Sequence, residues 1–411
     1  MLKIKSIKAK EIFDSRNNPT VEVEIETGPR GYPGKFSASV PSGASKGKTE
    51  AVELRDEDGK GVKKAIGNIK KIIAPAIKNK DFSSQREVDG ILIKLDGTEN
   101  KSRLGVNAIL PISMAVCRAF AALEKLPLYR YIRKIYNSQI IDYNLPKPCF
   151  NIIEGGAHAE NELGVQEFMI IPQKKYFREN FKIGSEIYQA LKNILLKDSD
   201  KTSLEIGDEG GFAPKLSKTE QALYPLLNSI KDYPETKIGL DCAASQFYKD
   251  DKYQLDGQDF TRSGLLDFYS EIITRFPIIF IEDPFSQDDW QGFEEITKKF
   301  FGKINIIGDD LLTTNIKRIK EARAKSACNG LILKPNQIGT VTETLEAGSL
   351  AKEAGWKIIV SHRSGETMDD FIADLAVGVG ADFIKAGAPV TPERMAKYNR
   401  LLEIEGEVAR Q

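Results

Sequence analysis

The stretch KIGLD at residues 237–241 is the first of six short apolar runs, each ending on a side chain that can bind a metal ion or move a proton. The runs that follow end at Glu282, Asp309, Lys334, His362 and Lys385. From Glu282 onward these closing residues are 23 to 28 apart, the length of one strand, one helix and two short connections. Strands buried on both faces read as continuous apolar runs, and the carboxyl ends of the strands in a (β/α) barrel meet at one mouth. The sequence therefore predicts an α/β barrel whose mouth gathers these six side chains.

Three of the closing residues, Asp241, Glu282 and Asp309, are carboxylates from successive strands. Hard oxygen ligands suit Mg²⁺ or Mn²⁺ better than zinc. A single carboxylate in this position is as often a helix cap as a ligand, but three at consecutive strand ends favour a metal site. We expect Lys334 and Lys385 to lower each other's pKa by like-charge repulsion, which would allow a lysine to act as a general base. Together these residues indicate proton abstraction next to a metal-bound carboxylate.

The first third of the chain follows a different pattern. Residues 3–13, 20–27 and 34–40 alternate polar and apolar positions, as three strands of an antiparallel meander do. Residues 61–77 and 107–126 have helical periodicity, and the second segment is apolar enough to be largely buried. We therefore predict a small α+β domain over residues 1–135 and a barrel domain over residues 145–411. The segment IYNSQIIDYNLPKP at 135–148 is the predicted linker.

Composition excludes several classes of protein. The 411 residues contain 59 basic and 59 acidic side chains, so no charge excess points to a nucleic-acid partner. The four cysteines, Cys117, Cys149, Cys242 and Cys328, are far apart and form no CxxC pair, which argues against a disulfide framework and favours the cytoplasm. No apolar run approaches 18 residues, so we expect no membrane partner.

A series of motifs along nearly the whole chain resembles the enolase family. They are FDSRNNPTVEVEIET (13–27), VPSGASKGKTEAVELRD (40–56), GGAHAEN (155–161), GDEGGFAP (207–214), IEDPF (281–285), GDDLLTTN (308–315), LKPNQIGT (333–340), VSHRSGET (360–367) and IKAGAP (384–389). One short motif would be weak evidence, but this many in one order are specific. The resemblance implies an N-terminal α+β domain followed by a ββαα(βα)₆ barrel similar to a TIM barrel.

The resemblance also implies an activity, a lyase reaction of glycolysis and gluconeogenesis. It is the reversible, Mg²⁺-dependent dehydration of 2-phosphoglycerate to phosphoenolpyruvate, catalysed by phosphopyruvate hydratase. Two Mg²⁺ ions per active site are implied, the second bound only with substrate. Enolases also form homodimers or octamers of dimers.

The family's residue roles carry over to matching positions. Lys334 would be the general base, and Glu209, supported by Glu167, the general acid. His158 would lie on a mobile loop near the substrate phosphate, and His362 would line the pocket. The residues implied to bind substrate are Gln166, Arg363, Ser364 and Lys385, with Arg363 and Ser364 on the phosphate. Asp241, Glu282 and Asp309 would hold the first Mg²⁺, and Ser45, in a lid loop at 41–47, would help hold the second.

Two alternatives remain open from the sequence. One is a diverged member of the enolase superfamily that acts on another carboxylate, and the other is a non-enzymatic surface-binding protein. The retained pair Arg363 and Ser364 favours enolase over the diverged enzyme, because a guanidinium is suited to phosphate. The clearest departure from the family is IEGGAHAEN in place of INGGSHAGN, which predicts Glu154 and Glu160 in the loop around His158.

Overall fold

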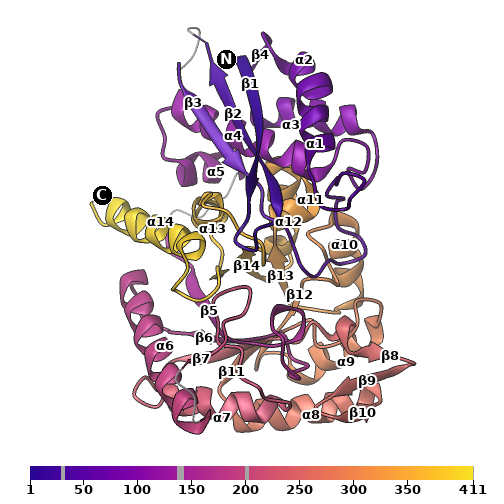
Figure 1. Ribbon diagram of the computed structural model, residues 1–411, viewed down its shortest axis with the longest axis vertical. Helices are drawn as coiled ribbons and strands as arrows, with labels where there is room; N and C mark the ends of the chain where they lie inside the picture. The colour runs from indigo at the N-terminus through magenta and orange to yellow at the C-terminus, as the bar shows by residue number, and fades with distance from the viewer. Residues whose placement is uncertain (29–32, 137–142, 200–202, 411) are drawn as a thin grey trace.

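The computed structural model describes residues 1–28, 33–136, 143–199 and 203–410. Figure 1 shows an N-terminal sheet with its helices standing over the mouth of a closed barrel. The predicted linker at 135–148 falls partly outside the described residues, so the domain limits 1–135 and 145–411 stay predictions.

The N-terminal sheet has the strand order β3-β2-β1-β4 and is antiparallel at each pairing. The predicted meander is confirmed by β1 (Leu2–Phe13), β2 (Pro19–Thr27) and β3 (Lys35–Ser39), whereas the short edge strand β4 (Asp81–Phe82) was not expected. Val21, Val23 and Ile25 alternate along one face of β2 and are fully buried, which is the period-2 pattern read from the sequence.

Five α-helices and one π-helical turn complete the described part of the N-terminal domain. They are α1 (Lys63–Asn68), which continues through a π-helical turn (Ile69–Ile73) into α2 (Ala74–Ile77), α3 (Gln85–Asp96), α4 (Val106–Leu123) and α5 (Leu128–Tyr136). The two expected helices correspond to α1–α2 and α4, but α3 and α5 were missed. The sequence does contain signals for both ends of α3. Ser84 is an N-cap that accepts a hydrogen bond from the Glu87 N–H, and Gly97 ends the helix with φ of 69°.

The helix α4 is long and apolar enough to cross a membrane by length and composition alone, but 83% of it is buried inside the protein. It packs against β2, β3, α3 and α5. A helix that is apolar on all sides belongs in a protein core when its surface is covered in this way. We therefore interpret α4 as the core helix of the N-terminal domain.

The barrel closes in the order β11-β12-β13-β14-β15-β5-β6-β7. Its strands are β5 (Lys147–Glu154), β6 (Glu167–Ile171), β7 (Lys237–Asp241), β11 (Ile278–Glu282), β12 (Asn305–Gly308), β13 (Gly330–Leu333), β14 (Lys357–Ser361) and β15 (Phe383–Lys385). All neighbours are parallel except β6, which is antiparallel to β5 and β7. Two helices, α6 (Phe177–Ser199) and α7 (Thr219–Ser229), follow β6 before the βα units begin. The predicted ββαα(βα)₆ order is confirmed.

The remaining barrel helices alternate with strands as the spacing predicts. They are α8 (Arg262–Arg275), α9 (Trp290–Phe300), α10 (Ile316–Lys325), α11 (Pro335–Ile338), α12 (Val341–Glu353), α13 (Phe371–Val379) and α14 (Pro392–Val408). The wider gap before Glu282 holds an unexpected three-stranded sheet of β8 (Tyr248–Lys249), β9 (Lys252–Leu255) and β10 (Gln258–Phe260).

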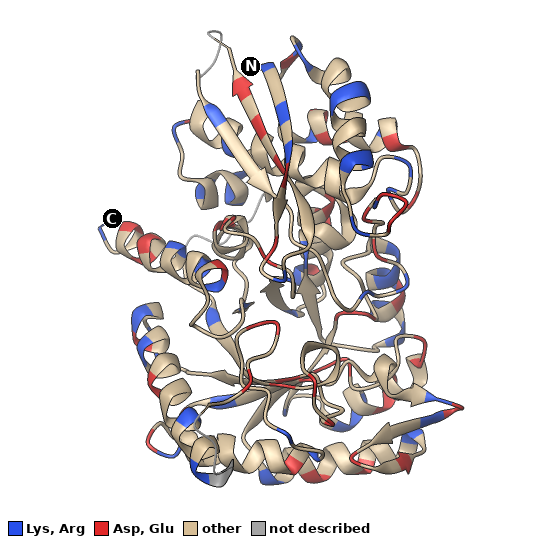
Figure 2. Cartoon of the chain, in the orientation of Figure 1, with Lys and Arg blue, Asp and Glu red and all other residues tan. Residues whose placement is uncertain are grey.

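The barrel interior is a packed core. Seven strands contribute to one cluster of buried side chains: Cys149, Met169, Ile171, Phe280, Ile307, Ile332, Ile359 and Phe383. These residues lie below the strand ends, so apolar contacts support the polar mouth from beneath. Figure 2 shows charges of both signs on the outer helices and acidic segments at the centre of the molecule, between the two domains.

The two domains are joined by an ion pair that is largely, but not fully, buried. On α4, Arg118 donates to both carboxylate oxygens of Asp369 at 2.8 Å and to Asp370 at 3.0 Å. Asp369 also accepts the backbone N–H of Ser39, which lies in β3. This carboxylate therefore connects the N-terminal sheet and α4 to the loop that precedes α13.

We expect Arg118→Ala to lower the free energy of unfolding by about 2–3 kcal/mol, because it leaves Asp369 buried without its charged partner. Urea denaturation followed by circular dichroism measures the loss. Lys134→Ala is the control, since the Lys134–Glu124 pair is largely exposed and its removal should cost less than about 1 kcal/mol. Equal losses in the two variants would contradict a structural role for the interdomain pair.

Candidate active site

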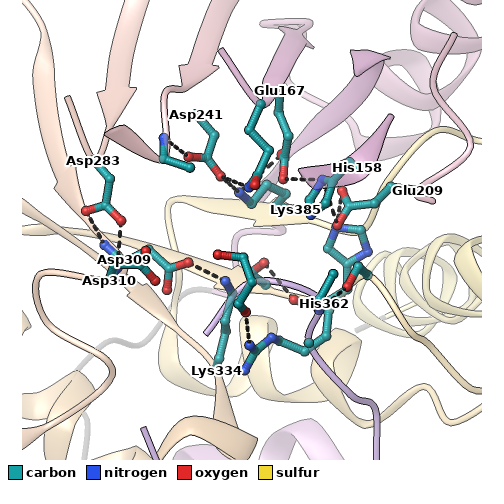
Figure 3. Close-up of a pocket in the computed structure, with 18 residues that line it drawn as sticks. His158, Glu167, Glu209, Asp241, Asp283, Asp309, Asp310, Lys334, His362 and Lys385 are labelled. Atoms are coloured by element: carbon teal, nitrogen blue, oxygen red, sulfur yellow. Dashed lines mark hydrogen bonds and ion pairs between the residues drawn. The ribbon is translucent and has the colours of Figure 1, made fainter. Parts of the chain in front are cut away.

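A small pocket lies at the mouth of the barrel, under the loop at residues 41–47 (Figure 3). Of the predicted site residues, all except Glu282 line it. Glu282 is fully buried just behind the pocket wall, where its carboxylate contacts Lys385. The barrel strands thus bring the predicted residues together at one place.

Lys385, at the end of β15, is surrounded by three carboxylates. Its Nζ lies 2.8 Å from Glu282 Oε2, 3.2 Å from Asp241 Oδ2 and 3.2 Å from Glu167 Oε2. The three acidic residues are Cα partners along β6, β7 and β11, so the sheet register places them at one level. Burial alone would lower the pKa of Lys385, but these carboxylates raise it well above its ordinary value.

Lys334 follows β13 and donates a hydrogen bond to Asp309, whose other oxygen accepts from Gln337 Nε2 at 2.8 Å. Burial and the positive charges of Arg363 and Lys385 lower the pKa of Lys334, but the charge of Asp309 opposes them and the net shift is upward. Lys385 does lower the pKa of Lys334, as expected, but the net shift of both lysines is upward, so a lowered pKa is not what the structure shows. Carboxylates in contact with each ammonium outweigh the more distant like charge.

Of the predicted metal ligands, Asp241 and Glu282 contact Lys385, whereas Asp309 contacts Lys334. A tighter acidic group is formed by Asp283, Asp309 and Asp310, whose oxygens approach within 4.8 Å of one another. Burial, Asp309 and Glu50 raise the pKa of Asp310 to about 7. Sequence reasoning missed Asp283 and Asp310, although each directly follows a predicted ligand in IEDPF and GDDLLTTN.

The pocket and its wall therefore carry an excess of carboxylates. They are Glu167, Asp241, Glu282, Asp283, Asp309 and Asp310, all buried, and the ammonium groups beside them belong to Lys334 and Lys385. Buried carboxylates are stable when cations compensate them, and oxygen-only donors fit Mg²⁺. The residues present therefore fit a divalent metal ion.

A second group, on another side of the pocket, contains histidines and carboxyls. His158 Nδ1 lies 3.6 Å from Glu167 and 3.8 Å from Glu209, and His362 Nε2 lies 3.0 Å from Glu209. Burial and the neighbouring charge of Glu209 raise the pKa of Glu167 well above its ordinary value. Burial would raise the pKa of Glu209 too, but His362 and His158 lower it. Two carboxyls this close are expected to raise each other's proton affinity, but only the pKa of Glu167 is raised, and that of Glu209 is lowered.

Arg394, on α14, determines the protonation state of His362. Its guanidinium lies 2.6 Å from His362 Nδ1 and, because arginine only donates, Nδ1 must be the acceptor. The ring proton is then on Nε2, which faces Glu209. Burial and the charge of Arg394 lower the pKa of His362 to about 3, although Glu209 opposes this shift. Arg394 lies 32 residues from His362 and was not anticipated from the sequence.

Known proteins match this chain along nearly its full length. The family model described as "Enolase, N-terminal domain" matches residues 4–132, and "Enolase, C-terminal TIM barrel domain" matches residues 142–411. The chain belongs to the enolase family. Enolase B of Dictyostelium discoideum is 50% identical over 99% of this chain and 95% of its own length. The enolases of Methanocaldococcus jannaschii (49%; 98% and 95%) and Mastigamoeba balamuthi (49%; 99% and 96%) are similarly close. This similarity supports enolase function for the chain.

The 41–47 loop of this enolase-family protein is held over the pocket by Arg363 and Ser364. Arg363 Nη2 donates to the Ser45 carbonyl at 2.9 Å, and the Ala44 N–H donates to Ser364 Oγ at 2.7 Å. Arg363 is also paired with Glu50, at 2.8 Å. The cavity volume is only about 30 Å³ with the loop in this position, so we expect a phosphorylated substrate to require movement of the loop. Glu50 was not singled out from the sequence.

The two glutamates that depart from the family pattern occupy different environments. Glu160 is exposed, on the loop that carries His158, as expected. Glu154 is not in that loop, because it is the last residue of β5 and is fully buried. The expectation for Glu154 is therefore corrected: it lies beside Glu209, behind the pocket.

Proposed function

We propose that this protein catalyses the reversible dehydration of 2-phosphoglycerate to phosphoenolpyruvate, a hydro-lyase reaction of glycolysis and gluconeogenesis in the cytoplasm. The observation that carries the proposal is that Lys334 and the Glu167–Glu209 pair face one small, closed pocket. The reaction needs one group to remove a proton and another to supply one. Membership of the enolase family supports the choice of substrate, and a homodimer or an octamer of dimers is the proposed assembly.

Each proton-transfer role belongs to a different side of the pocket. Lys334 removes the proton from C2 of the substrate. Glu209, with Glu167 beside it, delivers a proton to the departing hydroxyl group on C3. His158 and His362 hold the orientation of these carboxyls through the contacts described above. Closure of the 41–47 loop excludes water, which strengthens the electrostatic interactions in the pocket.

The remaining polar residues bind the substrate. Lys385 neutralises its carboxylate, and Gln166 contacts it from the start of β6. Arg363 and Ser364 bind the phosphate, for which Arg363 exchanges its ion pair with Glu50. A bidentate guanidinium is well suited to a phosphoryl group.

Asp241, Glu282 and Asp309 are the proposed ligands of one Mg²⁺, and Ser45 contributes to a second that binds together with substrate. When bound, Mg²⁺ supplies the positive charge that an enolate dianion requires. Its ligands would be carboxylates that raise the pKa values of Lys334 and Lys385, so a bound ion would compensate the charge of these same groups.

An absorbance assay of phosphoenolpyruvate formed from 2-phosphoglycerate, with and without Mg²⁺, tests the proposal. We expect turnover that depends on the metal. Mg²⁺ binding without turnover of 2-phosphoglycerate would overturn it in favour of a diverged enzyme acting on another carboxylate. Absence of both would favour the non-enzymatic alternative.

We expect Glu160→Gly to lower KM for 2-phosphoglycerate while changing kcat little. Glu160 carries a negative charge on the His158 loop, and this charge opposes the approach of an anionic substrate. Steady-state kinetics at several ionic strengths measure the effect, and the gain should shrink as salt rises. Glu160→Gln separates charge from backbone flexibility and should behave like Glu160→Gly. An unchanged KM in both variants would show that the charge of Glu160 does not affect substrate binding.

A further inference from the structure

The buried carboxylate of Glu154 is bonded to the backbone of the segment that carries Glu209. Oε2 accepts the Glu209 N–H at 3.1 Å, and Oε1 accepts the Gly211 N–H at 2.5 Å. Three residues earlier in β5, Asn151 donates to the Glu209 carboxylate at 3.1 Å. One strand therefore positions both the backbone and the side chain of Glu209.

The segment 207–211 fits closely around this carboxylate. A Cβ atom at Gly207 would lie 2.3 Å from Glu154 Oε2, and one at Gly211 would lie 2.8 Å from Oε1. Both distances are shorter than any ordinary non-bonded contact, so only glycine allows this approach. On the other side, Tyr188 of α6 donates to the Gly210 carbonyl at 2.9 Å. The Ala388 N–H also donates to the Glu209 carbonyl at 2.9 Å, and Arg394 donates to the Asp208 carbonyl at 3.0 Å. Glu154 is the side chain that accepts the N–H groups of Glu209 and Gly211.

Glu154 also adds a carboxyl group to the proton-transfer side of the pocket. It is the Cα partner of Glu167 across the β5–β6 ladder. Burial and the charge of Glu209 raise the pKa of Glu154 well above its ordinary value, whereas the two backbone N–H groups favour its ionised form. The other titratable or charged groups that face Glu209 are His158 from the loop, Glu167 from β6, His362 from β14, Lys385 from β15 and Arg394 from α14. Groups this close titrate together, so a change in one alters the others.

We propose that Glu154 is a positioning residue for Glu209: its carboxyl oxygens accept the backbone N–H groups of Glu209 and Gly211 and hold the 207–211 segment, and with it the Glu209 side chain, in place. This inference rests on the proposed function, because it takes Glu209 to be the general acid. Glu154 thus acts on the proton-transfer step through the position of Glu209.

Glu154→Gln tests this role. Glutamine keeps the size of the side chain, but its amide can accept only one of the two N–H groups. In the dehydration direction, we expect kcat to fall about tenfold with KM little changed, because a displaced acid weakens the chemical step and not substrate binding. Hydrogen–deuterium exchange at 207–211 should become several-fold faster.

Glu154→Asp is the matched variant, since it keeps the charge and shortens the reach. It should also show faster exchange at 207–211 and a lower kcat, because its oxygens do not reach both N–H groups. Thermal unfolding verifies that both variants are folded, and Glu162→Gln, on the exposed neighbouring loop, controls for loss of charge alone. Unchanged exchange in both Glu154 variants, or an unchanged kcat in Glu154→Gln, overturns the proposal. If wild type does not turn over 2-phosphoglycerate, the proposed function fails, and the exchange measurement still decides whether Glu154 holds the segment.

Discussion

Lys334→Ala is expected to abolish exchange of the C2 proton of 2-phosphoglycerate with solvent and to lower kcat by about 10³-fold or more. Lys334 is the amine directly after β13 that faces the pocket, with Asp309 as its ion-pair partner. Alanine leaves no group at this position to accept the proton. Deuterium incorporation at C2, followed by NMR in ²H₂O, measures the exchange directly.

Glu209→Gln is the comparison for this experiment. It should block loss of the hydroxyl group while some C2 exchange remains, because Glu209 contacts His362 and lies on another side of the pocket from Lys334. Lys385→Ala should also lose activity, through substrate carboxylate binding and through the pKa of Lys334. Wild-type exchange in Lys334→Ala would assign proton removal to another residue.

The second large effect is expected from the carboxylates of the proposed metal site. Asp241→Asn, Glu282→Gln and Asp309→Asn should each weaken Mg²⁺ binding and reduce turnover, because each removes a charge from a site for a hard cation. Loss of the carboxylate also frees Lys385 or Lys334 from its partner, so both binding and proton transfer are affected. Mg²⁺ titration by isothermal calorimetry, together with activity at limiting Mg²⁺, measures the two effects separately.

Asp250→Asn is a control for these variants, since Asp250 is exposed between β8 and β9 and should not affect Mg²⁺ binding. Asp283→Asn asks a further question, because Asp283 belongs to the tighter acidic group with Asp309 and Asp310. Undiminished turnover in Asp241→Asn, Glu282→Gln and Asp309→Asn at limiting Mg²⁺ would rule out the proposed ligands.

The barrel was predictable because its strands are buried on both faces and end on chemically distinctive residues. Asp241, Lys334 and Lys385 each close an apolar run, and the barrel topology alone requires such residues to meet at one mouth. The strand β4 and the hairpin strands β8–β10 were not predicted, because elements of two to four residues have too little periodicity to detect.

Electrostatic details were harder to predict than positions. The pKa values of Lys334 and Lys385 depend on which carboxylates touch them, and spacing along the chain does not contain this information. The same holds for Arg394 and Glu154, whose partners His362 and Glu209 come from distant segments. Motif comparison indicated that Glu154 departs from the family pattern. Its burial beside Glu209 follows from its place as the last residue of β5, which the motif does not show.

The filled interior of the barrel has a consequence for isotope transfer. Side chains such as Met169, Phe280 and Ile332 leave no aqueous path from the base of the barrel, so the ammonium of Lys334 can exchange hydrons with solvent only through the mouth. That exit lies beneath the 41–47 loop, which Arg363 and Ser364 hold in place. A deuteron taken from C2 should therefore remain on the lysine for as long as the loop is shut. The fraction of deuterium returned to the substrate then reports the rate at which the loop opens.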